Sequence, residues 1–123
     1  MLMILAEYAA ANADGTFTVV RGGIDIWKTK SIPFDFQASL LLEVAGSGLP
    51  RGFVNMRVSV RDASGATVCE FSGSGVLPKP DERIRAAIHI GGKIASVGPL
   101  VIEAQVGLET ARQVVNVQLD GEN

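Results

Sequence analysis

Residues that bind metals or form disulfides are almost absent from this chain, whose 123 residues include one cysteine, Cys69, and one histidine, His89. Structural zinc takes a set of Cys and His ligands, and a disulfide needs a second cysteine, so the chain cannot supply either alone. No acidic segment has the alternating spacing of a calcium loop. We therefore predict that the chain holds no metal and uses no cofactor.

Catalytic residue types are equally scarce. His89 is the only imidazole, and no Ser or Cys nucleophile lies beside it in a tight elbow motif. A Cys69–His89 pair across strands is conceivable, but a lone cysteine on an inner face is usually a small buried hydrophobe. We predict no catalytic residues and no enzymatic activity. An enzyme that uses His89 or Cys69 is the less favoured hypothesis.

An excess of one charge and a long apolar run are also lacking. The chain has 11 basic and 13 acidic residues, a net charge of −2, which disfavours binding to nucleic-acid phosphates. No apolar run approaches the roughly 18 residues that span a bilayer. The apolar residues 1–6 have no positive charge before them and end at Glu7, unlike a signal peptide. The sequence therefore predicts a cytoplasmic protein with no nucleic-acid or membrane partner.

Alternation of apolar and polar residues is abundant by contrast. In residues 53–62, Val54, Met56, Val58 and Val60 alternate with polar side chains, which predicts a strand with one buried and one solvated face. Turn residues 63–66 and a return strand at residues 67–72 complete a hairpin. Similar alternation, or a β-branched and aromatic composition, predicts further strands at residues 2–10, 16–20, 34–44, 83–90, 100–106 and 113–119, and residues 24–28 continue the chain in extended form.

Residues 1–11 are ambiguous, because their Leu, Met, Ala and Glu favour a helix. A hairpin signal at residues 12–15 and the β-branched segment after it favour a strand instead, and we adopt the strand. Glycine- and proline-rich turns are expected at residues 46–50, 73–80 and 91–99. About seven or eight short strands of this kind predict one all-β domain over residues 1–123, a β-sandwich or a small barrel.

The N-terminal motifs follow a recognisable order. Leu5-Ala6-Glu7-Tyr8-Ala9 is followed by the hairpin signal Asp14-Gly15 and by Gly22-Gly23. In this order the chain resembles a family of small bacterial proteins of unknown function, and Gly98-Pro99-Leu100 with its following hairpin is similar to the end of that family. The resemblance implies an immunoglobulin-like β-sandwich of mostly antiparallel strands in a bacterial cell. It brings no catalytic residues with it.

Trp27 is the only tryptophan. If Ile24 and Ile26 face the core, alternation places Asp25 and Trp27 together on the opposite face, where an indole beside a carboxylate can stack on a sugar ring. The alternative, which we favour, is that Trp27 folds over a sheet edge as an outlying part of the core. A small-ligand or carbohydrate site at Trp27 and Asp25 is therefore the second functional hypothesis.

Several residues on faces that should be solvated suggest an interface. Apolar side chains fall on outward positions at three places, Leu41, Val101 and Val114. Outward positions also hold four arginines, Arg57, Arg61, Arg83 and Arg85. If their strands are neighbours, these arginines form one basic stripe that would attract an acidic partner or the acidic C-terminal part of another copy. The alternative, which we favour for the arginines, is that they lie on ordinary solvated sheet faces. The favoured function is a non-enzymatic interaction or self-assembly module that forms a homo-oligomer or binds a protein partner.

Overall fold

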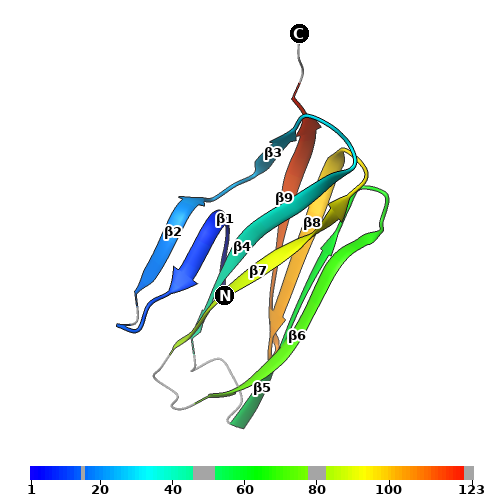
Figure 1. Ribbon diagram of the computed structural model, residues 1–123. Coiled ribbons are helices and arrows are strands. Elements are labelled where there is room, and N and C mark those ends of the chain that lie inside the picture. Colours follow the sequence, from blue (N-terminus) through cyan, green and yellow to red (C-terminus); the bar gives the residue numbers. More distant parts are fainter. Residues whose placement is uncertain (15, 46–51, 78–82, 121–123) are drawn as a thin grey trace.

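Every regular element of the described chain is a β-strand. The computed structural model describes residues 1–14, 16–45, 52–77 and 83–120. Because these ranges contain no helix, they contain none that is long and apolar enough to cross a membrane. The strands, shown in Figure 1, are β1 (Leu2–Ala11), β2 (Phe17–Gly22), β3 (Ile26–Thr29), β4 (Phe34–Ala45), β5 (Gly52–Arg61), β6 (Thr67–Leu77), β7 (Arg83–Ile94), β8 (Gly98–Val106) and β9 (Glu109–Leu119).

The strands form two sheets that pack face to face, so the predicted β-sandwich is confirmed. Sheet A has the order β2-β1-β4-β7, and sheet B has the order β3-β9-β8-β5-β6. All neighbours are antiparallel except β3 and β9. In an immunoglobulin sandwich the strands are lettered from A to G; B pairs with E, and F lies between C and G. The pairing of β4 with β7 corresponds to B–E, and the order β5-β8-β9 corresponds to C–F–G. The described chain has nine strands, where the sequence predicted seven or eight.

The core lies between the sheets and follows the predicted alternation. On the inner face of sheet B, Val58 and Val60 of β5 lie opposite Ala104 and Ile102 of β8. These buried side chains form one cluster with Phe36 of β4 in sheet A. Burial of this apolar surface is the main stabilising term of such a sandwich. The outward side chains of the same strands lie outside this core.

Strand β1 resolves the ambiguity of the N-terminal segment in favour of a strand. Its first half pairs with β4, from Leu2 opposite Glu43 to Ala6 opposite Ser39. Its second half pairs with β2, with Ala11 opposite Phe17. Strand β1 is therefore paired along its length, with β4 in one half and with β2 in the other, and this tertiary context outweighs the helix propensity of its residues.

The glycines predicted as turns lie partly inside strands. Gly91 and Gly92 belong to β7, and Gly73 belongs to β6. A Cβ atom at Gly92 would lie 2.4 Å from the carbonyl oxygen of Val68, so glycine is required there for β6 and β7 to approach closely. Residues 46–50 and 78–80 of the predicted turns lie outside the described residues.

The β1–β2 hairpin covers part of the outer face of sheet A. Leu41 lies directly opposite Ile4 and Ala87 in the sheet and packs against Phe17 of β2. Phe17 also lies 5.8 Å from the guanidinium carbon of Arg85 on β7, although two strands separate β2 from β7 in the sheet. The hairpin therefore bends over this face and forms a second, smaller apolar cluster on it.

Candidate functional site

The outer face of sheet B brings together four of the seven predicted interface residues. Arg61 of β5, Val101 of β8 and Val114 of β9 lie directly opposite one another, and we call this line the Arg61 row. Arg57 lies on the same face of β5, since side chains alternate with a period of two. Val101 is half-buried, and Val114 is 45% exposed.

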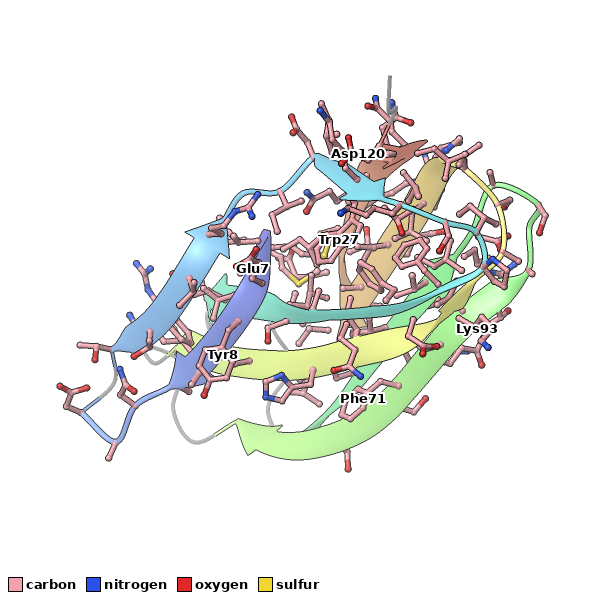
Figure 2. All side chains as sticks on the ribbon, turned by 45° about the horizontal axis from the view of Figure 1, so that its top comes forward. Glu7, Tyr8, Trp27, Phe71, Lys93 and Asp120 are labelled. Atoms are coloured by element: carbon pink, nitrogen blue, oxygen red, sulfur yellow. The ribbon has the colours of Figure 1, made fainter. Side chains whose placement is uncertain are left out.

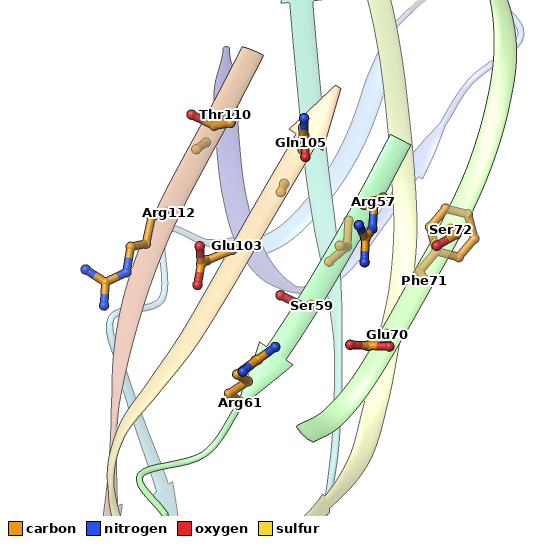
Figure 3. A pocket seen from close by; sticks show the side chains of 13 residues that line it. Arg57, Ser59, Arg61, Glu70, Phe71, Ser72, Glu103, Gln105, Thr110 and Arg112 are labelled. Carbon is orange, nitrogen blue, oxygen red and sulfur yellow. The ribbon is translucent and has the colours of Figure 1, made fainter. Parts of the chain in front are cut away.

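Two further rows of polar side chains cross this face (Figure 3). The central row consists of Arg112 on β9, Glu103 on β8, Ser59 on β5 and Glu70 on β6, which face one another in register. The Arg57 row, on the side of the central row away from the Arg61 row, consists of Thr110, Gln105, Arg57 and Ser72.

The charged side chains of this face have no partners among the described residues. No hydrogen bond or ion pair within those residues involves Arg57, Arg61, Arg112, Glu70 or Glu103. Arg112 and Glu103 face each other in register, yet the guanidinium points away from the carboxylate (Figure 3). These side chains surround a shallow hollow of about 420 Å³ above Ser59. Three arginines and two glutamates are thus free to pair with an incoming molecule.

The turn between β5 and β6 sets the register of this face. The carboxylate of Asp62 accepts hydrogen bonds from Ser64 N (2.9 Å), Ser64 Oγ (2.6 Å) and Ala66 N (3.2 Å). These bonds, with the Ser64 hydroxyl contributing most, lower the pKa of Asp62 below its usual value. A register shift next to Arg61 follows in the β5–β6 ladder. The capped turn therefore fixes where Arg61 and Glu70 stand relative to each other.

The other three predicted interface residues lie on sheet A, so the condition for one basic stripe, that the strands of the arginines are neighbours, is not met. Arg83 and Arg85 are on β7, which is in a different sheet from β5. Both bind Glu43, with Arg83 Nη1 2.6 Å and Arg85 Nε 2.9 Å from its carboxylate. The hydrogen bond from Arg83 is the main reason why the pKa of Glu43 is lowered.

Leu41 was predicted to be exposed, and this was also wrong. It is only 4% exposed, because the β1–β2 hairpin covers it. Alternation correctly places Leu41 on the outer face of β4, but a hairpin that folds over this face cannot be inferred from a period of two. Leu41 is a packing residue of the second apolar cluster.

The predicted exposed face of Trp27 and Asp25 does not form. Trp27 is half-buried and packs edge-on against the core residue Phe36, with ring centroids 4.8 Å apart at 67°. It is Ile26 that faces outward, 49% exposed. Strand β3 begins only at Ile26, so the alternation assumed through residues 24–28 is broken before it. The alternative that we favoured, a tryptophan at the edge of the core, is confirmed.

A hydrogen-bonded pair on sheet A escaped the sequence analysis. Ser39 Oγ lies 2.9 Å from His89 Nδ1, and the ring of Tyr8 lies 5.8 Å from the imidazole. Ser39 is only 1% exposed, so its hydroxyl cannot reach a substrate as a nucleophile. The alternation of the sequence places Ser39 and His89 on outward faces. It cannot show that β4 pairs with β7, which makes the two residues neighbours.

Cys69 and His89 point to different sides of the molecule. Cys69 packs against the core, while His89 is exposed on the outer face of sheet A. Burial raises the pKa of the Cys69 thiol, which disfavours the thiolate. Within the described ranges, no group of three or more His, Cys, Asp and Glu side chains has the geometry to hold a metal ion.

The fold and this face define a β-sandwich domain with a polar, charge-bearing outer sheet. No known family model matches the chain, and a search of characterised proteins finds no significant match. The resemblance to a bacterial family therefore stays a prediction from short motifs.

Proposed function

We propose that this chain is a non-enzymatic protein-interaction module that binds its partner with the outer face of sheet B. The observation that carries the proposal is the set of five charged side chains on that face without partners among the described residues. Complementary charges on a partner can pair with such side chains without first breaking bonds within the chain. Val101 and Val114 add apolar area at one side of the face.

The contrast with sheet A supports the choice of face. On the outer face of sheet A, Glu43 is bound by two arginines, and Leu41 is covered by the β1–β2 hairpin. These groups of sheet A are therefore engaged within the chain. The five charged side chains of the sheet B face have no such contacts among the described residues.

The test is a comparison of captured proteins between two variants with the same change in charge. Arg57→Glu/Val114→Asp alters the face, whereas Lys93→Glu/Val20→Asp makes the same change in charge on sheet A, where Val20 is also 45% exposed. With the tagged chain as bait and its untagged copy included among the prey, we expect the first variant to lose partners that the second retains. Equal capture by both variants would overturn the proposal.

A second candidate function, small-ligand binding, is favoured by a hollow of about 540 Å³ beside Trp27. The hollow is lined by Ile24, Ile26, Trp27 and Lys28, and by the Glu7–Arg21 ion pair (2.7 Å). Because Trp27 is the only tryptophan, its fluorescence reports on this place alone. A saturable emission shift with one oligosaccharide of a panel would support the candidate, and no shift with any of them would exclude carbohydrate binding here.

We further propose a bacterial cytoplasmic setting for the module. Support comes from the single cysteine, which suits a reducing compartment, and from the N-terminal motif resemblance. Fractionation of cells that express the chain from its own gene tests the compartment, and recovery outside the cytoplasm would contradict it.

A further inference from the structure

We propose that the partner of this face is a second copy of the same chain, held face to face around a two-fold axis that runs parallel to the strands. The inference rests on the proposed function, because it names the occupant of the same surface. Its basis is the order of charges across sheet B, which is complementary to itself after one particular rotation.

The rotation axis lies above the line between β8 and β5. It places β8 of one copy over β5 of the other, and β9 over β6, while each row stays over its own counterpart. In the central row, Arg112 then faces Glu70 of the second copy, and Glu70 faces Arg112 of the second copy. Two such symmetry-related ion pairs mark the two edges of the interface.

The middle of the interface receives Glu103. In the same arrangement Glu103 faces Ser59 of the second copy, over the hollow of about 420 Å³. Arg57 and Arg61 flank Ser59 two residues to either side on β5, and diagonal neighbours at this spacing are within reach of long side chains. Each Glu103 carboxylate therefore enters between two guanidinium groups that have no partner among the described residues.

Three other symmetric arrangements of the same two faces bring like charges together. A two-fold axis perpendicular to the strands through the central row places Arg112 over Arg112 and Glu103 over Glu103. A strand-parallel axis moved to lie above β8 also places Glu103 over Glu103, and one above β5 places Glu103 over Glu70. The axis between β8 and β5 avoids each of these repulsions, and it pairs Arg112 with Glu70 at both edges of the interface.

Apolar contacts and sheet geometry agree with this arrangement. Val101 lies over Arg61 of the second copy, whose aliphatic stem can cover it. Val114 lies beside this pair in the same row and is shielded at the edge. Aligned packing within about 30° is the usual geometry of stacked sheets, and a strand-parallel axis permits it.

Charge-reversal variants test the inference. The dimer Kd of the full chain is measured by analytical ultracentrifugation over about 1 to 500 μM protein. We expect wild type to form dimers, and Glu70→Arg and Arg112→Glu each to raise the dimer Kd about tenfold or more. The combined variant Glu70→Arg/Arg112→Glu should regain most of the affinity, since its pairs are restored with exchanged signs. Asp35→Arg, an exposed change on sheet A, is the control and should leave the Kd within about twofold.

The outcomes separate this inference from the proposed function. A wild-type monomer at all concentrations, or a dimer unaffected by either single reversal, overturns the second copy as occupant. So does a combined variant that stays dissociated although circular dichroism shows it folded. If the capture experiment still distinguishes the two faces in these cases, the interaction function stands with another partner.

Discussion

Ser39 Oγ and His89 Nδ1 lie 2.9 Å apart on the neighbouring strands β4 and β7. The serine is nearly fully buried, whereas the imidazole is exposed and lies against Tyr8. A buried hydroxyl without a partner is costly, and His89 provides that partner. The pair that resembles a catalytic dyad is therefore a structural contact that joins two strands of sheet A, next to Tyr8 of β1, which is labelled in Figure 2.

A double-mutant cycle should measure this contact. We expect His89→Leu to cost about 1–3 kcal/mol in the free energy of unfolding, because it leaves the Ser39 hydroxyl buried and unpaired. In a variant that already carries Ser39→Ala, His89→Leu should cost less. The coupling free energy between the two changes, measured by urea denaturation, should be about 0.5–1.5 kcal/mol. Strictly additive effects would show that the hydrogen bond does not contribute to stability.

Asp62 should make the stability of the domain depend on pH. Its pKa is lowered in the folded state by the Ser64 hydroxyl and by the backbone amides of Ser64, Ala66 and Ala95. A carboxyl group with a lowered folded pKa stabilises the fold at neutral pH, and this contribution is lost as the pH falls through the acid range. Asp62→Ala should therefore cost about 1–3 kcal/mol at pH 7 and clearly less near pH 3.

The matched variant is Asp62→Asn, which keeps an acceptor oxygen for the turn but removes the charge. It should lose less stability than Asp62→Ala at pH 7 and should lack the wild-type contribution to pH dependence. Chemical denaturation at the two pH values provides the readout. If wild type and both variants lose stability equally on acidification, Asp62 is not the source.

Leu41 and Val114 both take outward positions in the sequence pattern, but their substitution should change the stability by very different amounts. Leu41→Ala removes a side chain buried under the β1–β2 hairpin, so we expect a loss of about 2–5 kcal/mol. Val114→Thr changes an exposed position on sheet B and should alter the stability of the monomer by less than about 0.5 kcal/mol. Denaturation in dilute solution measures both effects.

Hydrogen exchange locates the effect of Leu41→Ala. Amides of β1 and β2 should lose protection more than those of β8 and β9, because the hairpin packs on Leu41 and sheet B does not. Unchanged protection in β1 and β2 would mean that the hairpin is held by other contacts.

Gly92 should not tolerate even a methyl group. Gly92→Ala places a Cβ atom 2.4 Å from the Val68 carbonyl oxygen, so β6 and β7 must separate, and we expect a cost of about 1–3 kcal/mol. Gly73→Ala is the control, because its Cβ atom would meet only the end of the Phe71 ring at 3.2 Å. Similar losses for both variants in thermal unfolding would contradict a close strand approach at Gly92.

Local patterns were enough to predict most of the strands and the buried face of each. Alternation identified Val58, Val60 and Ile102 as core residues, since side chains of a strand point to opposite faces in turn. It also identified four outward residues of the candidate face, Arg57, Arg61, Val101 and Val114. It failed at Trp27, because the chain leaves extended pairing just before β3 and the period is lost there.

The sequence by itself determined that this is an all-β chain with one core and with charged residues on its outward faces. Only the tertiary structure decided which strands became neighbours. That assignment placed Arg57 and Arg61 beside Glu70 and Glu103 on sheet B, and bound Arg83 and Arg85 to Glu43 on sheet A. The physical reason is that alternation is local to one strand, whereas pairing, and the hairpin that buries Leu41, depend on contacts between residues distant in the chain.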